Sequence, residues 1–214
     1  DNACLTYWKT ETSVGRMGKK TLSDRFFHTL LQIIMHDPRN NISSADKAEF
    51  RKYDDENEFS NYQKVIESGK WDKIEFAKIV AAYANIFKQI YSKKAIQENS
   101  ESYKTPLKRI LLTIFTLDVY TAVPYVLYIL KNVADKAEQD KIFTLLESYI
   151  IRRQICNQVV KNYSDLFTES LIGQQILTYD ALVEYLSNKK PNESLHMPYD
   201  AEVEDGFATN SNLT

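Results

Sequence analysis

The sequence contains few of the residues that break helices or cross-link chains. Among 214 residues there are 5 glycines, 5 prolines and 2 cysteines. So few breakers argue against a β-sandwich, which needs many turns, and favour long helices. Cys4 and Cys156 are too few for a disulfide framework or a zinc site, and this usage is typical of a reducing compartment. We therefore expect a helical protein of the cytoplasm.

An excess of one charge sign and a long apolar run are also missing. Lys and Arg number 27 against 29 Asp and Glu, so no strong field draws the whole molecule to nucleic acid or to a membrane. The longest apolar stretch is interrupted by Asp118 and Pro124 and falls short of the roughly 18 apolar residues of a membrane helix. No signal-peptide pattern is visible. Because the chain begins at Asp1 rather than Met, we expect a fragment of a longer protein.

The sequence is rich in apolar residues at the three- and four-residue spacing of amphipathic helices. This spacing predicts an all-α fold. No heptad pattern persists as it does in a coiled coil, so we expect an irregular multi-helix bundle of about eight helices. The predicted helical segments are residues 21–36, 45–53, 61–68, 70–94, 103–117, 122–134, 138–160, 162–173 and 177–190.

Capping and turn residues indicate where these helices begin and end. The expected N-caps are Ser43 or Ser44, Thr121 and Ser164, and the expected C-terminal residues are Gly69 and Gly173. Residues 1–19 are expected to be irregular, with Trp8 as their one large anchor. We assign residues 1–190 to a helical domain and residues 191–214 to a loose, polar and acidic tail that leads toward a missing domain.

Signals for catalysis and for metal binding are weak. His28 and His36 are eight residues apart, about two helical turns, so their rings cannot share one ion on a straight helix. Cys156 lies beside Ile155 on an apolar helix face, which favours a buried small side chain over a nucleophile. An enzyme built on Cys156 stays open as an alternative. Otherwise we expect no catalytic, cofactor-binding or metal-binding residues in the chain.

Two adjacent arginines stand in the helical stretch ESYIIRRQICN, residues 147–157. Arg152 and Arg153 are about 100° apart around a helix, so one can face outward while the other faces a neighbouring helix. A half-buried guanidinium needs a carboxylate or backbone carbonyls. Glu147 has the wrong spacing for a pair within the helix, so the acceptors must come from elsewhere in the fold. We favour a structural role over an anion-binding role, and both remain open.

A short basic segment, GRMGKK at residues 15–20, is the clearest local signal for nucleic acid. It carries Arg16, Lys19 and Lys20, which are candidate phosphate contacts on a loop. The nearly neutral overall charge favours an ordinary solvated loop instead. This segment supports the alternative interpretation that the chain is a free-standing helical module that binds nucleic acid.

The stretch ESYIIRRQICN, followed by KNYSDLF, resembles the helical middle region of GmrSD-type, modification-dependent restriction proteins. CLTYWK, LSDRFFHTLLQIIM and HMPYDAEVEDGF resemble other segments of the same region, so the resemblance runs from about Leu5 to Phe207. Asn157 stands where the family has glycine. In that family a ParB/Srx-like nuclease domain with a DGQQR-type motif precedes the helical region, and an HNH nuclease domain follows it. This chain has neither a DGQQR-like nor an HNH-like motif.

The resemblance implies that both nuclease centres lie outside these residues. The chain is then a non-catalytic scaffold that couples an N-terminal, NTP-responsive domain to a C-terminal HNH domain in a DNA-targeting defence nuclease. NTP and a divalent metal belong to the parent protein. The implied partners are the flanking domains of the same chain, a second copy in a homodimer, and DNA through the parent protein. No membrane is implied. Arg152, Arg153 and Asn157 are the residues to which a structural or anion-binding role is assigned.

Overall fold

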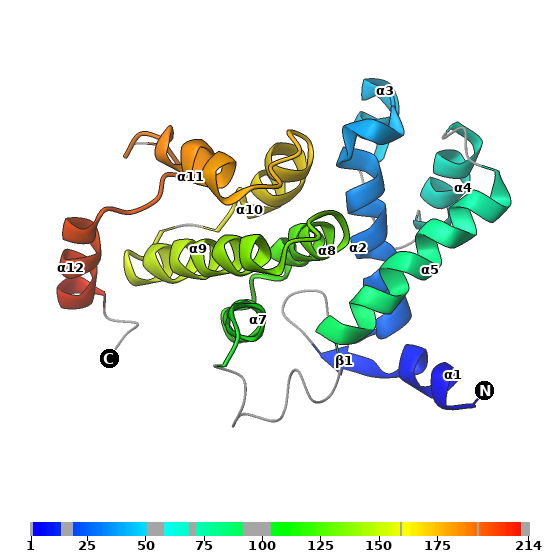
Figure 1. Cartoon of the computed structure of the whole chain (residues 1–214), viewed down its shortest axis with the longest axis horizontal. Helices are drawn as coiled ribbons and strands as arrows, with labels where there is room; N and C mark the ends of the chain where they lie inside the picture. Colours follow the sequence, from blue (N-terminus) through cyan, green and yellow to red (C-terminus); the bar gives the residue numbers. More distant parts are fainter. Residues whose placement is uncertain are drawn as a thin grey trace.

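The computed structural model describes residues 2–13, 19–50, 58–68, 72–91, 104–158, 160–191 and 193–210. Within these residues the fold is an all-α, irregular multi-helix bundle, which confirms the fold class predicted from the sequence (Figure 1). The sheet in the described part is one antiparallel hairpin of β1 (Glu11–Ser13) and β2 (Lys19–Thr21), with Glu11 opposite Thr21. No helix of the described part is long and apolar enough to cross a membrane.

The N-terminal residues are more regular than the sequence suggested. Helix α1 (Asn2–Lys9) precedes the hairpin, so the expectation that residues 1–19 are irregular is wrong for the described part of this range. Trp8 is the apolar anchor of the segment, because its ring contacts Phe26 and Phe87 at centroid distances of 5.4 and 6.0 Å. Aromatic contacts of this kind stabilise beyond the area they bury.

Helix α2 (Leu22–His36) begins and ends where its sequence predicts. Thr21 accepts a hydrogen bond from the backbone of Asp24, whose carboxylate accepts one from the backbone of Thr21, and this reciprocal pair is a capping box. After Asp37 the chain enters the short 3₁₀ helix η2 (Pro38–Asn40) and then Asn41, with φ of 51°. Proline removes a helical donor and Asn tolerates the left-handed region, so the segment DPRNN ends the helix.

Three helices follow before the middle of the chain: α3 (Ser44–Phe50), α4 (Glu58–Ser68) and α5 (Lys73–Ile90). The Ser43 hydroxyl accepts from the backbone of Asp46, so Ser43 rather than Ser44 caps α3. Asp72 caps α5 by accepting from two backbone N–H groups. Gly69, the expected end of α4, lies outside the described residues.

The second half of the chain begins with α7 (Pro106–Thr116), capped by Thr105, then the 3₁₀ helix η3 (Tyr120–Ala122) and α8 (Val123–Asn132). The expectation that Thr121 caps the next helix is wrong, because η3 leads directly into α8 and Ala122 occupies the N-cap position without a side-chain bond. Pro124 lies in the first turn of α8, where its missing N–H has no helical partner to lose.

Helix α9 (Lys136–Ile155) is followed by α10 (Tyr163–Asp165), the π-helix η4 (Leu166–Ile172) and α11 (Tyr179–Ser187). Ser164 lies inside α10, so its prediction as an N-cap is wrong. Gly173 follows η4 as predicted. A Cβ there would lie 2.1 Å from the carbonyl oxygen of Glu169, so only glycine fits this close approach.

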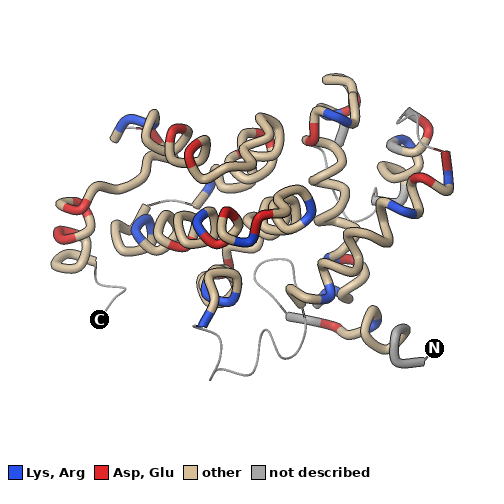
Figure 2. The backbone as a smooth tube through the Cα atoms, viewed as in Figure 1, with Lys and Arg blue, Asp and Glu red and all other residues tan. Residues whose placement is uncertain are grey.

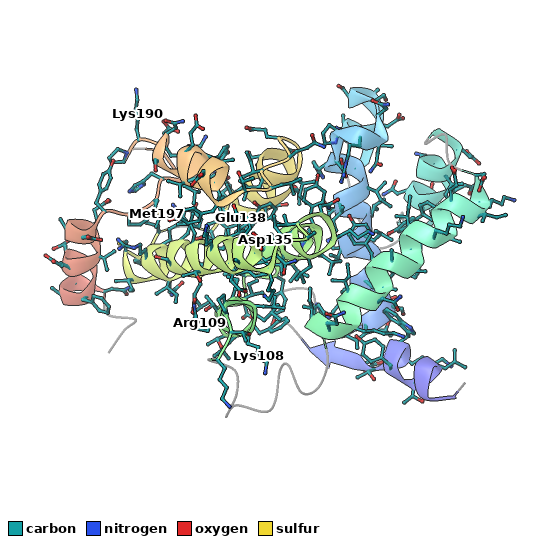
Figure 3. The ribbon with its side chains drawn as sticks, viewed as in Figure 1. Lys108, Arg109, Asp135, Glu138, Lys190 and Met197 are labelled. Atoms are coloured by element: carbon teal, nitrogen blue, oxygen red, sulfur yellow. The ribbon has the colours of Figure 1, made fainter. Side chains whose placement is uncertain are left out.

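The core surrounds α8, in which every residue from Val123 to Ile129 is buried. Helix α8 packs against α2, α5 and η4, and α9 packs against α7 and α11. Each large apolar side chain buried in this way contributes about 1.5–3 kcal/mol. Polar contacts also link α9 to α7 and α11: Arg109 of α7 binds Glu147 of α9 at 2.9 Å, and Glu138 of α9 accepts from the Tyr179 backbone at the start of α11. Figure 3 labels Arg109 and Glu138 on their helices.

The C-terminal residues form a further helix that the sequence analysis missed. Asp200–Thr209 make helix α12, which packs against α9. The expectation of a loose tail is therefore wrong for these residues. Figure 2 marks acidic residues on α12, whereas α9 carries both basic and acidic residues. The acidic residues of α12 hide its helical pattern from a search for apolar periodicity.

Candidate functional site

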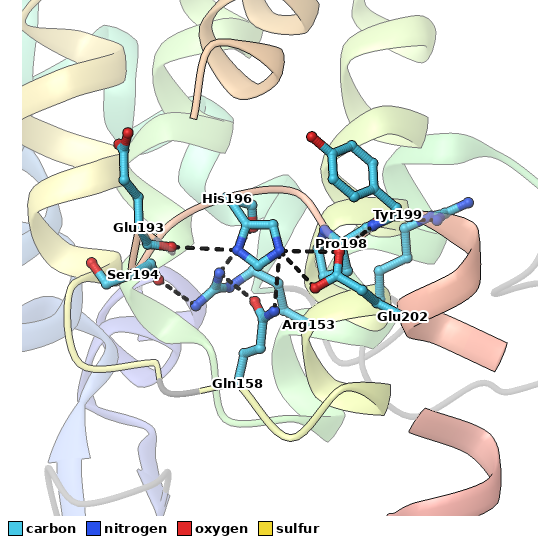
Figure 4. Close-up of polar contacts among 9 residues, drawn as sticks. Arg153, Gln158, Glu193, Ser194, His196, Pro198, Tyr199 and Glu202 are labelled. Carbon is cyan, nitrogen blue, oxygen red and sulfur yellow. Dashed lines mark hydrogen bonds and ion pairs between the residues drawn. The ribbon is translucent and has the colours of Figure 1, made fainter. Parts of the chain in front are cut away.

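Arg153, in the last turn of α9, is the most buried charged side chain of the candidate site, with 1% of its surface exposed. Its Nη1 donates to Gln158 Oε1 at 2.7 Å and to the His196 carbonyl at 3.0 Å, and its Nη2 donates to the Ser194 carbonyl at 2.7 Å (Figure 4). Its Nε donates to the Tyr163 hydroxyl at 3.0 Å. The guanidinium thus binds acceptors from two segments of its own chain: Gln158 and Tyr163 follow α9 directly, and Ser194 and His196 lie about 40 residues later.

Two tyrosine rings complete the surroundings of Arg153. The guanidinium carbon lies 5.5 Å from the ring centroid of Tyr149 and 5.3 Å from that of Tyr163. Burial raises the pKa of both phenols, and the guanidinium opposes that rise. The rings are therefore neutral, and their faces stabilise the cation. Tyr149 also donates its hydroxyl hydrogen to the Leu195 carbonyl at 3.0 Å, beside the two carbonyls that Arg153 binds.

Arg152 faces the other side of the same segment and is partly exposed. Its Nη1 donates to the Pro198 carbonyl at 3.1 Å, and its Nη2 forms an ion pair with Asp200 Oδ1 at 2.6 Å. Asp200 is the first residue of α12, where a negative charge is favoured by the helix dipole. Both arginines therefore have acceptors within residues 194–200, outside their own helix, and Arg153 also binds Gln158 and Tyr163.

Asn157 forms the turn that ends α9. It has φ of 52°, in the left-handed region that Gly and Asn adopt most readily. The Gln158 N–H donates to the Arg153 carbonyl at 2.9 Å, and the Asn157 N–H donates to the Gln154 carbonyl at 3.1 Å. These two bonds are those of a Schellman motif. The turn needs a residue that tolerates positive φ, and Asn157 contributes to the site through this backbone conformation.

His196 and Glu202 belong to this site, and sequence reasoning missed both. His196 is 4% exposed, and its Nε2 lies 3.0 and 3.2 Å from the two carboxylate oxygens of Glu202. Because a carboxylate accepts, Nε2 carries the hydrogen. The Tyr199 N–H also donates to Glu202, at 2.8 Å. This backbone bond and His196 lower the pKa of Glu202 below its ordinary value. The acidic residues just after Pro198 are a helix-start signal that could have located Glu202.

The C-terminal end of α12 contacts the end of α9 directly. Gly206 packs on Ile155, and a Cβ at Gly206 would lie 2.8 Å from the Ile155 carbonyl oxygen. Asn210 donates its Nδ2 hydrogens to the carbonyls of Gln154 and Ile155, at 3.1 and 2.8 Å. Carbonyls at the end of a helix lack partners within the helix. Asn210 therefore caps α9 from a different helix. We call this set of contacts between α9 and residues 193–210 the α9 clamp.

The other sequence-predicted residues lie away from the α9 clamp. Lys20 is half-buried on β2, which packs against α2, whereas the end of α9 lies beside α12 (Figure 1). The side chain of Lys19 and all of Arg16 lie outside the described residues. Among the residues that the structure describes, no group of three His, Cys, Asp or Glu side chains is placed to hold a metal ion.

Cys156 is half-buried at the C-cap of α9. Burial raises the pKa of its thiol, and the Glu202 carboxylate adds to the rise, against the opposing charges of Arg152 and Arg153. Nucleophilic attack requires the thiolate, so a raised pKa argues against the alternative in which Cys156 is a nucleophile.

Comparison of the chain with models of protein families, with curated proteins and with solved structures finds no match. The geometry of the α9 clamp is therefore the main structural evidence for a role. The clamp joins α9 and α12 through polar contacts with main-chain carbonyls. The guanidiniums of Arg152 and Arg153 are bound by acceptors of the chain itself.

Proposed function

We propose that this chain is a non-catalytic helical scaffold of a GmrSD-like DNA restriction nuclease. In this proposal it couples an N-terminal, NTP-responsive nuclease-like domain to a C-terminal HNH domain of the same cytoplasmic protein. The resemblance of ESYIIRRQICN and its neighbouring segments supports the parentage. The observation that carries the scaffold role is the α9 clamp, in which Arg152 and Arg153 bind the chain's own carbonyls and Asp200.

Helix α9 has 20 residues and a length of about 30 Å. It packs against α7 and α11 and carries the α9 clamp at its end. A long helix packed on both sides moves as a rigid body, so the orientation of α12 is fixed relative to the core. A displacement of the core is thereby passed to whatever follows α12. This is the physical basis on which the scaffold would couple two nuclease domains.

The first test separates the chain from its parent protein. We expect the chain alone neither to hydrolyse NTP nor to cleave modified or unmodified DNA, and the parent protein encoded by the flanking sequence to do both. DNA cleavage by the chain alone would contradict the proposal. Binding of DNA by the chain alone, lost steeply with added salt, would instead support the free-standing nucleic-acid module.

The second test concerns coupling in the parent protein. Arg152→Met removes the ion pair with Asp200 while keeping the stem of the side chain. We expect NTP hydrolysis to be retained and DNA cleavage to fall by up to about fivefold, the effect of losing a coupling energy of about 1 kcal/mol. Lys141→Met, an exposed change on the same helix, is the control. Equal cleavage by the two variants would contradict the coupling role.

A further inference from the structure

Helix α12 lies at one end of the molecule, beside the end of α9, and carries a row of apolar side chains (Figure 1). Tyr199, Val203 and Phe207 are spaced four residues apart, so they lie on one side of the helix. The two aromatic residues are 57% and 63% exposed, and Val203 between them is half-buried. Apolar side chains that are exposed together and rimmed by polar residues are typical of an interaction surface. We call these three residues the α12 aromatic row.

The α12 aromatic row is separate from the side by which the helix is held. Gly206 packs on Ile155, and Asn210 donates to the Ile155 carbonyl. Glu202, four residues before Gly206, contacts His196. Glu202, Gly206 and Asn210 therefore form the side that faces the α9 clamp. The α12 aromatic row is displaced from them by one residue, or about 100° around the helix, so a partner can cover the rings while the clamp stays intact.

The next side of the helix is acidic (Figure 2). Asp200 and Glu204 are four residues apart and exposed, and Asp205 adds a third exposed carboxylate. Residues 193–210 include no Lys or Arg and five acidic residues, which are Glu193, Asp200, Glu202, Glu204 and Asp205. Arg152 pairs with Asp200 and offsets one of these charges, so the segment stays net negative. The exposed rings thus have an acidic edge.

Rings and carboxylates side by side restrict the class of partner. Carboxylates repel the phosphates of nucleic acid and of anionic membranes. They also oppose a second copy of α12, because a symmetric contact brings the acidic side chains of both copies together. A protein segment with Lys or Arg beside apolar side chains satisfies both features, since aromatic rings accept apolar groups and cations alike. We propose that the α12 aromatic row and its acidic edge bind a basic amphipathic segment of another protein.

This proposal goes beyond the scaffold function and does not depend on it. The test titrates the whole chain into a fluorescent amphipathic peptide of leucine and lysine, and into the same peptide with glutamate in place of lysine. At low salt we expect the lysine peptide to bind with a Kd below about 100 μM, and the glutamate peptide to bind at least about tenfold more weakly. Equal binding of the two peptides, or tighter binding of duplex DNA or of phosphatidylserine vesicles, would overturn the proposal.

Variants assign the binding to α12. Phe207→Ser should weaken binding of the lysine peptide by about fivefold or more, because it removes an exposed ring from the contact. Ile74→Ser removes a similarly exposed apolar side chain from α5 and should change the binding by less than about twofold. Glu204→Lys should also weaken it by about fivefold, whereas Glu184→Lys, the same charge change on α11, is the control. Equal effects within either pair would refute the site.

Sedimentation velocity without peptide tests whether a second copy covers the rings. We expect any self-association of the chain to be the same in Phe207→Ser as in the unmodified chain. A dimer that Phe207→Ser dissociates would overturn the proposal. Urea denaturation of the variants should match that of the unmodified chain, because the changed side chains are exposed. If Phe207→Ser is destabilised, the comparison of Glu204→Lys with Glu184→Lys decides the question.

Discussion

The α8 core and the α9 clamp hold the fold together by different physical means. In α8, Leu127, Tyr128 and Ile129 are fully buried and gain stability from apolar burial and close packing. In the α9 clamp, Arg152, Arg153 and other polar side chains bind carbonyls and a carboxylate. Apolar burial is non-directional and insensitive to protonation, whereas the clamp depends on geometry and on charge. Apolar burial in the α8 core makes the helices pack together, and the α9 clamp sets the position of residues 193–210 against α9.

The largest expected effect is in the α8 core. Leu127→Ala should lower the free energy of unfolding by about 2–5 kcal/mol, through lost transfer energy and the cavity left behind. Urea denaturation would measure it. Because the core is shared by the whole bundle, amide exchange should accelerate throughout α8 and α9 together. If amide exchange instead became faster only in α12, the proposed difference between the α8 core and the α9 clamp would be contradicted.

Arg153→Met tests the α9 clamp with a side chain of similar length. It leaves the carbonyls of Ser194 and His196 without this donor. We expect a loss of about 3 kcal/mol in urea denaturation, because each unsatisfied buried acceptor costs about 1–3 kcal/mol. Arg152→Met is the matched control on the adjacent, partly exposed residue, and should cost about 1 kcal/mol or less. Equal losses for the two variants would contradict the structural role assigned to Arg153.

The α9 clamp should respond to pH and the α8 core should not. The Tyr199 N–H and His196 lower the pKa of Glu202 below its ordinary value of 4.5. A lowered folded pKa means that the carboxylate contributes stability above the unfolded value, which is lost as the pH falls through the folded value. Between about pH 6 and pH 3, Glu202→Gln should therefore lose less stability than the unmodified chain. Glu204→Gln, an exposed change on α12, is the control and should follow the unmodified chain.

The smallest expected effect is at Asn157. Asn157→Gly should raise the free energy of unfolding by about 0.5–1 kcal/mol, because glycine adopts positive φ without a steric cost. Asn157→Ala should lower it by about 1–2 kcal/mol, since alanine is disfavoured there. Both are measured by urea denaturation. If alanine proved as stable as glycine, the left-handed turn at this position would not be what ends α9.

The sequence predicts most of the helices because apolar periodicity reports packing against a core. It located α2, α5, α7, α9 and α11, whose apolar residues recur at helical spacing. It missed α12, where acidic residues dominate and where Gly206 faces the partner helix in place of an apolar side chain. It also missed the capping of α8, because η3 is a local structure without a side-chain signal.

The sequence predicted the hydrogen-bond donors of the candidate site but not their acceptors. Two arginines next to apolar residues require acceptors, and helical geometry predicted that at least one guanidinium is half-buried; in the structure Arg152 is partly exposed and Arg153 is fully buried. The acceptors could not be inferred from the sequence, because main-chain carbonyls carry no sequence signal. Ser194, His196 and Pro198 are also about 40 residues or more away from the arginines along the chain.

The contacts that α9 makes with Ser194, Leu195, His196 and Pro198 are made to backbone oxygens, whatever side chains those residues carry. Natural variants should therefore tolerate many substitutions at Ser194 and Leu195. Insertion or deletion of a single residue between 194 and 198 would displace every oxygen by one position relative to the guanidiniums. The length of this segment, more than its composition, should be what evolution keeps fixed.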